Sequence, residues 1–244
     1  MKRVVVFSLA ILFLGAATSF AQTNAQFAKA NQEFASGDFK AAIEDYEALV
    51  RSGMDAPNLF YNLGNAYFRK YDFGRAILNY ERALALDPRH PEAEANLRIA
   101  RDEAHALELM PDKWENVFAV ASENRFVVVA AVAFWILMFS IAALAFNRRR
   151  GLIALSILSL SIFALAMLAS YELDRGKNGR GLAIVTGENV EARLATADNA
   201  NRVLTLPAGS EIKVVSQRGD WIYAALPNNL RGWIPANSAE QVRM

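Results

Sequence analysis

The chain has 244 residues, and 54% of them are hydrophobic, an excess typical of sequences that contain membrane-spanning segments. Its 26 Lys and Arg residues balance 25 Asp and Glu, so the overall charge does not favour nucleic acid or another polyanion as a partner. The chain contains no cysteine, which excludes disulfides, thiolate metal sites and cysteine nucleophiles.

The first residues have the pattern of an export signal, which we predict over residues 1–21. Two basic residues precede an apolar stretch from Val4 to Ala17, and Ser19-Phe20-Ala21 is a small-x-small cleavage site. The mature chain would then begin near Gln22. If the signal is not cleaved, the segment is an N-terminal anchor. In either case we expect the chain from Asn24 onward to lie outside the cytoplasm.

The next segment contains an internal repeat. Gly37–Glu47 aligns with Tyr71–Glu81 at an offset of 34 residues, as from Ala42 to Ala76, which is the period of tetratricopeptide repeats (TPRs). The diagnostic positions of this family in the second copy are Phe60, Leu63, Gly64, Tyr67, Ala76, Tyr80, Ala83 and Pro88. The segment therefore resembles the TPR family, in which each repeat is a pair of antiparallel helices. This implies an all-α unit over residues 22–109.

The flanking copies depart from the pattern. The first copy has Ala30 and Glu33 at the positions of Gly64 and Tyr67, as terminal repeats often do. A third segment, Glu92–Leu109, is helical in character but places arginines, at positions 98 and 101, where small and aromatic residues are typical. We interpret it as a polar capping helix. Two repeats and a cap are near the minimum for a stable stack. We therefore expect contact with the membrane or with a partner to stabilise this unit.

Two uncharged apolar runs predict a membrane hairpin. Residues 126–146 and 152–171 are each long enough to cross a bilayer as a helix of about 20 residues, and residues 147–151 separate them. Three arginines at this tip favour a cytoplasmic loop, although three basic residues after the second run weaken the argument. The export signal decides the orientation, because two crossings return the chain to the side of the repeats.

The flanks and interior of the hairpin add two expectations. Residues 110–125 form either a helix along the membrane interface, with Trp114 at the level of the lipid headgroups, or a plain connector. Neither apolar run contains an ionisable side chain, so we do not predict a path for ions or protons.

After a linker over residues 172–180, the pattern changes to short alternating strands. The five expected strands are Ala183–Val185, Val190–Ala192, Val203–Leu206, Glu211–Val214 and Trp221–Ala224. The segment also contains Gly219-Asp220-Trp221 and Gly232-Trp233-Ile234-Pro235. These sequences resemble recurring signatures of the bacterial SH3 family, which implies a small all-β barrel over residues 181–244.

The sequence contains no evident catalytic or metal-binding arrangement. His90 and His105 lack the cysteine or carboxylate spacing of a metal site, and we expect both to be solvated. The glycine-rich segment 176–181 lacks the spacing of a phosphate loop, and no helical pattern follows it. We therefore predict no enzyme, no metal and no cofactor, and we look for binding surfaces instead.

The TPR resemblance implies a groove lined by the first helix of each repeat. The family geometry, carried to this chain, places in this groove Phe27, Asn31, Phe34, Tyr61, Asn62, Asn65, Phe68 and Asn96. Asn62 and Asn96 are one repeat apart, and their amides could bind the backbone of an extended peptide. Alternatively, Asn62 belongs to the common TPR consensus run Tyr61–Gly64. Because groove-facing side chains are not the packed ones, we expect the fold to survive replacement of both asparagines.

The SH3-like segment offers a second candidate surface. Trp221, Tyr223 and Trp233 form either an aromatic ligand surface or, for the two tryptophans, part of the barrel core. Small barrels commonly bury at least one such tryptophan, so we expect a mixed role.

The order of export signal, TPR unit, two-helix hairpin and SH3-like segment resembles the BatE-type proteins of the Bacteroides aerotolerance operon along nearly the whole chain. This resemblance implies a non-enzymatic partner of proteins with von Willebrand A domains and of a MoxR-type ATPase, linked to oxidative or envelope stress. We thus expect a multidomain scaffold in the bacterial inner membrane, with both folded units on the periplasmic side. The alternative is a cell-wall sensor whose SH3-like domain binds peptidoglycan.

Overall fold

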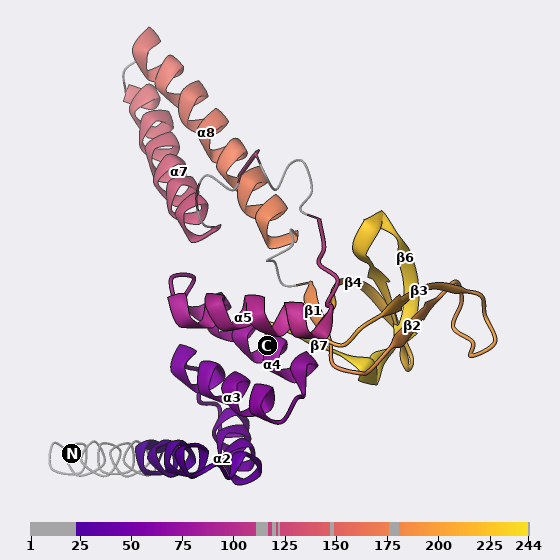
Figure 1. The fold of residues 1–244 in the computed structure, drawn as a ribbon. Helices are drawn as coiled ribbons and strands as arrows, with labels where there is room; N and C mark the ends of the chain where they lie inside the picture. The colour runs from indigo at the N-terminus through magenta and orange to yellow at the C-terminus, as the bar shows by residue number, and fades with distance from the viewer. Residues whose placement is uncertain are drawn as a thin grey trace, which may run out of the picture.

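The structure is a computed structural model that describes residues 23–110, 117–118, 121, 123–146, 149–175 and 181–243. The predicted signal peptide, most of the connector with Trp114, and residues 176–180 of the linker lie outside the described residues. Three parts are described: a helical repeat unit, a pair of long apolar helices and a C-terminal β domain (Figure 1).

The repeat unit consists of five helices. They are the helix over residues 23–36, α2 (Phe39–Arg51), α3 (Pro57–Arg69), α4 (Phe73–Leu86) and α5 (Pro91–Ala104). The period of the sequence determines where they begin: Asp38 caps α2 by accepting from the Ala41 N–H, and Asp72 caps α4 by accepting from the Arg75 N–H. Pro57 and Pro91 each occupy the first position of a helix, where a missing N–H costs nothing.

Small residues allow the helices of the repeats to approach closely. Ala30, Ala42 and Ala76 are completely buried. A Cβ added at Gly64 would lie 2.8 Å from the Tyr80 ring, so no larger side chain fits between α3 and α4. The predicted TPR-like helical repeats are therefore confirmed.

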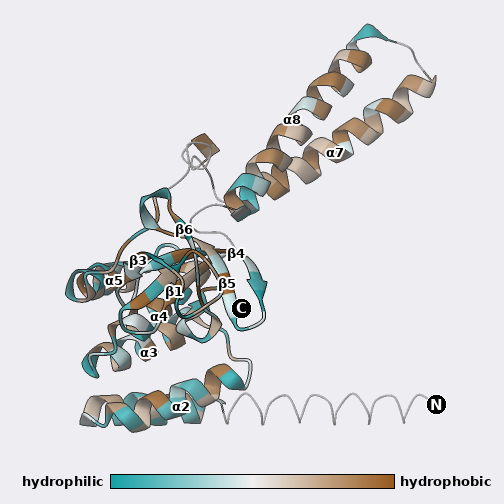
Figure 2. Ribbon diagram, turned by 90° about the vertical axis from the view of Figure 1, so that its right-hand side faces the viewer, coloured by the Kyte–Doolittle hydropathy of each residue, from teal (hydrophilic) through white to brown (hydrophobic). Residues whose placement is uncertain are grey.

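The two long helices are α7 (Glu123–Phe146) and α8 (Arg150–Arg175), which pack against each other and extend away from the rest of the chain (Figure 2). Within them, Asn124–Phe146 and Arg150–Asp174 are long and apolar enough to cross a membrane. Only 22% and 17% of their apolar windows are buried, whereas a core helix of a soluble protein would be mostly buried. They are thus two candidate membrane helices, joined midway by a 2.8 Å hydrogen bond between Ser140 and Ser156.

The β domain is a seven-stranded antiparallel sheet. Its strands are β1 (Leu182–Val185), β2 (Val190–Arg193), β3 (Arg202–Leu206), β4 (Glu211–Arg218), β5 (Trp221–Ala225), β6 (Arg231–Pro235) and β7 (Ala239–Gln241). Their spatial order is β3-β2-β6-β5-β4-β1-β7. β1 to β5 lie where the sequence predicts strands. β6 contains the pair Gly232-Trp233 and β7 follows it, and neither was predicted as a strand.

Strand β1 belongs to two hydrophobic cores at once. All four of its residues are buried. Ala183 and Val185 pack into the core of the β domain, whereas Leu182 and Ile184 pack into the core of the repeats. This follows from the alternation of side chains along a strand. The repeats and the β domain are consequently one packed body rather than two independent modules.

Two glycines allow the β domain to approach α4. A Cβ added at Gly74 would lie 3.1 Å from the Val185 carbonyl oxygen, and one added at Gly209 would overlap Ile77. Gly209 also has φ +85°, a conformation that other residues rarely adopt. The sequence predicts a repeat stack that needs outside support, and the structure shows that this support comes from the chain's own β domain.

A buried ionic network joins the same two parts. The Tyr67 hydroxyl donates a hydrogen bond to Glu47. Arg101 and Glu81 stand one period after these two residues, and the Arg101 guanidinium donates to Glu81 in the equivalent contact. Arg101 also donates to Glu211 of β4, whose side chain is 1% exposed. The sequence predicts a polar capping surface at Arg101. Instead, this arginine is largely buried, because the β domain covers it.

Candidate partner-binding groove

A hydrogen-bonded group of two asparagines and a tyrosine occurs in each repeat. Asn31 Oδ1 accepts from the Tyr46 hydroxyl at 2.6 Å and from Asn62 Nδ2 at 2.9 Å. One period later, Asn65 Oδ1 accepts from the Tyr80 hydroxyl and from Asn96 Nδ2, both at 2.8 Å. Each group connects the two helices of one repeat to the first helix of the next.

These bonds change what can be expected of Asn62 and Asn96. The Asn62 amide already donates one hydrogen bond inside the fold, and the Asn96 amide donates to Asn65 and, at 3.5 Å, to the Tyr61 hydroxyl. Removal of either amide therefore affects the packing of the repeats as well as any partner. The expectation that the fold is indifferent to both replacements is therefore not supported. A carboxamide has two N–H donors and a carbonyl acceptor, so Asn62 retains one N–H and its carbonyl for a partner, and Asn96 retains its carbonyl.

The tyrosines of the two groups are buried, which keeps their hydroxyls neutral. Burial raises the pKa of Tyr46 to about 12, and burial likewise raises the pKa of Tyr80. Both hydroxyls therefore act as hydrogen-bond donors throughout the physiological pH range.

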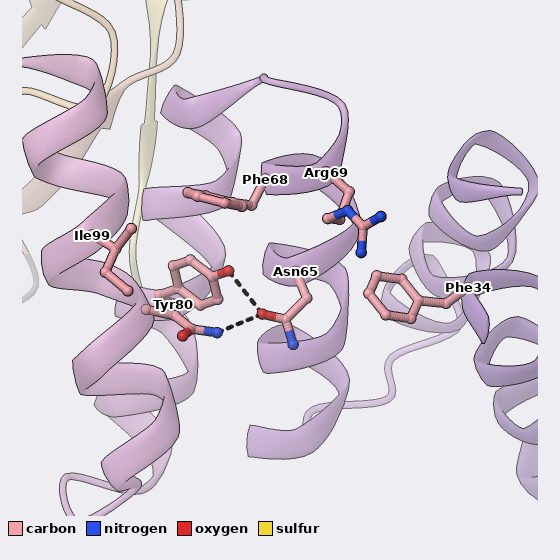
Figure 3. Close-up of a pocket in the computed structure, with 7 residues that line it drawn as sticks. Phe34, Asn65, Phe68, Arg69, Tyr80 and Ile99 are labelled. Carbon is pink, nitrogen blue, oxygen red and sulfur yellow. Dashed lines mark hydrogen bonds between the residues drawn. The ribbon is translucent and has the colours of Figure 1, made fainter. Parts of the chain in front are cut away.

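A cavity of about 250 Å³ opens between the helix over residues 23–36, α3 and α5, which are the first helices of the two repeats and of the third segment (Figure 3). Its lining residues are Phe34, Asn65, Phe68, Arg69, Tyr80, Asn96 and Ile99. Phe34 comes from the first helix, Phe68 and Arg69 from α3, and Ile99 from α5. In Figure 3, Phe34 and Ile99 face each other across the space in front of Asn65. We call this cavity, with its seven lining residues, the groove pocket.

The groove pocket contains half of the residues predicted for the groove: Phe34, Asn65, Phe68 and Asn96. The other predicted residues lie elsewhere on the repeats. Phe27 packs beside Tyr46 with ring centroids 5.9 Å apart, and Tyr61 packs between Tyr80 and His90. His90 is therefore not solvated as expected: its ring covers Tyr61, and its Nδ1 caps α5 by accepting from the Ala93 N–H.

Sequence reasoning missed three lining residues, namely Arg69, Tyr80 and Ile99. Ile99 stands one period after Asn65, so the repeat register alone could have identified it. Arg69 has no basic equivalent in the other units, since Ala35 precedes it by one period and Glu103 follows it. Nothing in the repeat pattern indicated its position.

The rim of the groove pocket is electropositive. The Arg69 guanidinium lies 4.5 Å from the centroid of the Phe39 ring, a cation–π contact that fixes its position. Neither Arg69 nor its neighbour Lys70 forms a salt bridge with any described residue. No acidic side chain lines the pocket within the described part of the chain.

The aromatic residues of the β domain lie on the outer face of the sheet. Ile222, Ala224 and Ile234 point into the core, so the alternating residues Trp221, Tyr223 and Trp233 point away from it. All three are partly exposed. Tyr223 and Trp233 are cross-strand partners whose ring centroids are 5.0 Å apart. Neither tryptophan belongs to the core cluster of the β domain, and both are half-buried on its outer face. A core position for one of them, as the mixed role expects, is therefore not supported.

Comparison with known proteins agrees with the helical part of this description. The sequence model of the family described as tetratricopeptide repeat matches residues 27–91 and, in a second overlapping register, residues 61–106. These ranges cover the helices that line the groove pocket. No curated protein matches the chain. Tetratricopeptide repeats are protein-interaction elements that are typically not catalytic.

Proposed function

We propose that this protein is a non-enzymatic, membrane-anchored adaptor that holds a protein partner in the groove of its repeats. The groove pocket is the observation that carries this proposal. It combines three apolar walls with the amides of Asn65 and Asn96, which is the composition expected where a peptide segment binds.

The position of the β domain supports the choice of this face. The β domain packs on α4 and on the C-terminal part of α5, through Gly74, Arg82 and Arg101. None of these three residues lines the groove pocket, and Ile99, which does line it, remains 50% exposed. A partner can therefore enter the groove without displacing the β domain.

The way the long helices leave the soluble body supports membrane anchoring. Leu109 and Leu182 flank the apolar helices in the sequence and lie in the same hydrophobic core. A single folded body cannot lie on both sides of a bilayer, so two crossings are the arrangement that returns the chain to it. We place the body on the periplasmic side of the bacterial inner membrane, because residues 1–21 have the pattern of an export signal.

The physiological setting of the proposal comes from the resemblance to BatE-type proteins. On that basis the partners are membrane proteins with von Willebrand A domains and a MoxR-type ATPase system, in an aerotolerance or envelope-stress complex. The bilayer is a further partner through α7 and α8. No nucleic acid is involved in this function.

The outer face of the β domain favours one second candidate. Tyr223 and Trp233 are two neighbouring, partly exposed rings tilted by 41° to each other, and such a pair is suited to bind sugars or peptides. The domain could thus sense the cell wall by binding peptidoglycan. This alternative requires the sheet face rather than the groove.

Crosslinking in native membranes tests the adaptor proposal. Ile99→Arg should block the groove pocket at little cost to the fold, because Ile99 is half exposed. Leu194→Arg is the matched control, since it makes the same change at a 65% exposed position of the β domain. We expect the wild type and Leu194→Arg to capture the same von Willebrand A-domain proteins, and Ile99→Arg to lose them. Equal capture by all three forms would contradict the groove.

Sedimentation with purified peptidoglycan tests the alternative. If the β domain senses the wall, Trp233→Ala should abolish sedimentation while Ile99→Arg retains it. Sedimentation that depends on neither substitution would exclude both surfaces as the wall-binding site.

A further inference from the structure

We propose that the groove pocket selects a partner segment that carries one aromatic side chain next to an acidic residue. This inference rests on the proposed function, because it names the chemistry of the partner that the same groove would hold. Three observations carry it: the size of the pocket, the fixed orientation of its walls and the unpaired charge on its rim.

The size of the pocket limits what can enter. Ligand pockets for whole small molecules measure roughly 300–1,000 Å³, whereas the groove pocket measures about 250 Å³. This volume suits one large side chain that projects from a longer segment. The segment itself must remain outside, on the open surface of the repeats.

The walls favour an aromatic occupant because they are aromatic and rigid. Phe34 packs edge-on against Phe39 with centroids 5.3 Å apart, and Phe68 packs in the same way against Phe73 at 5.4 Å. These contacts hold both rings in place before a partner arrives. A further ring can then pack against their faces or edges, which is the preferred geometry between aromatic side chains, and it would cover the exposed Ile99.

The rim adds a preference for negative charge next to the aromatic residue. Arg69 is held over Phe39 and has no acidic partner among the described residues. A guanidinium binds a carboxylate through two parallel hydrogen bonds, which gives direction as well as attraction. Because Arg69 also lines the pocket, the carboxylate must lie within a residue or two of the aromatic side chain.

The floor provides a donor for the backbone of the segment. Asn65 Oδ1 is occupied by Tyr80 and Asn96, so the amide orientation is fixed and Asn65 Nδ2 points away from the Tyr80 hydroxyl (Figure 3). It has no hydrogen-bond partner among the described residues. A backbone carbonyl beside the aromatic residue would satisfy it.

Peptide selection on the full chain in lipid nanodiscs tests this inference. The probe is a displayed library of random dodecapeptides, selected in parallel against the wild type, Arg69→Glu, Lys70→Glu and Ile99→Arg. Lys70→Glu is the matched control, because Lys70 is the adjacent unpaired cation but does not line the pocket.

We expect the wild type and Lys70→Glu to enrich peptides with an aromatic residue beside Asp or Glu. Arg69→Glu should keep the aromatic preference but exchange the acidic residue for Lys or Arg. A peptide selected on the wild type should lose about tenfold or more in affinity for Arg69→Glu, as expected when a charged hydrogen bond is lost.

Two failures are distinguishable. In the first, the wild type enriches peptides that Ile99→Arg does not, but these peptides lack an aromatic residue, or the Arg69→Glu variant does not select Lys or Arg in place of the acidic residue. The groove then binds peptides, and this inference is wrong. If the wild type enriches nothing beyond what Ile99→Arg enriches, both the inference and the proposed groove function are wrong.

Discussion

The backbone N–H of Leu109 donates a 2.9 Å hydrogen bond to the side chain of Glu211, so the last residue of the repeat unit is attached to a strand that follows both long helices. A second hydrogen bond joins the same two segments, because the backbone N–H of Glu211 donates to the Leu107 carbonyl at 2.8 Å. The apolar helices are therefore inserted in the sequence between two segments of one folded body.

Single cysteines can test the resulting topology, because the chain has no cysteine of its own. Glu44→Cys in α2, Asn237→Cys before β7 and Arg149→Cys between the long helices all change exposed positions. With a membrane-impermeant maleimide, we expect positions 44 and 237 to be labelled from the same side and position 149 from the other. Labelling of positions 149 and 237 from one side would exclude the two-crossing hairpin.

The network around Arg101 predicts a large effect of Glu211→Ala on stability. Glu211 is almost completely buried, and its loss would leave Arg101 and the Leu109 N–H without this partner. Removal of one member of a buried ion pair typically costs about 3–5 kcal/mol. Thermal unfolding of the full chain in detergent measures this cost.

Glu191→Ala provides the matched control for this substitution. Glu191 forms ion pairs with Arg193 and Arg202, but its side chain is 40% exposed. Its loss should cost no more than about 1 kcal/mol, as for other surface ion pairs. Equal melting temperatures for the two variants would show that the buried network does not hold the β domain on the repeats.

Gly64→Val should destabilise the repeats through overpacking. The added Cβ would lie 2.8 Å from the ring of Tyr80, which is itself buried and cannot move away. We expect a loss of about 1–3 kcal/mol in the free energy of unfolding. Ala95→Val, at an exposed position of α5, controls for the helix propensity of valine. A Gly64→Val protein that melts with the control would mean that α3 and α4 do not cross here.

Asn31→Ala and Asn65→Ala should destabilise the protein by similar amounts. Each removes the acceptor of a buried tyrosine hydroxyl and of an asparagine amide in the next unit. An unsatisfied buried polar group costs about 1–3 kcal/mol. Urea unfolding curves of the two variants compare these costs directly, and a clear loss in one repeat without a loss in the other would refute their equivalence.

The raised pKa of the buried Tyr46 predicts a loss of stability at alkaline pH. The pKa of Tyr46 rises from 10.0 to about 12 because the side chain is buried. The unfolded chain therefore loses this proton first as the pH increases. The contribution of Tyr46 to the free energy of unfolding should be constant below pH 10. Between pH 10 and about 12 it should fall by roughly 1.4 kcal/mol per pH unit. Urea unfolding at a series of pH values measures this slope, and Tyr46→Phe should reduce it; an unchanged slope would contradict the assignment.

The parts of the fold that could be predicted are those with a local pattern. The offset of 34 residues identifies the helices of the repeats, uninterrupted apolar runs identify α7 and α8, and period-two alternation identifies β1 to β5. Each of these patterns reports on residues that are neighbours along the chain. Repeat geometry carries positions from one unit to the next, and in this way it brought together Phe34, Asn65, Phe68 and Asn96, which line one cavity; that they bind a partner stays a prediction.

The remaining features depend on contacts between distant segments. The short run Leu182–Val185 shows that β1 is apolar, but it does not show that its two faces enter different cores. Arg101 resembles a surface residue of a cap until Glu211, far along the chain, is placed beside it. The charge of Arg69 at the rim likewise becomes informative only when its position next to Phe34 and Ile99 is known.

The double burial of β1 also determines the order in which the protein can mature. Leu182 and Ile184 complete the core of the repeats, yet the ribosome makes them only after both long helices. Until these residues have been synthesised, part of the apolar surface of the repeats remains uncovered. Nascent chains in such a state are prone to aggregate or to recruit chaperones. The complete core of the repeats would then form only after both long helices have been made and the β domain has folded onto α4.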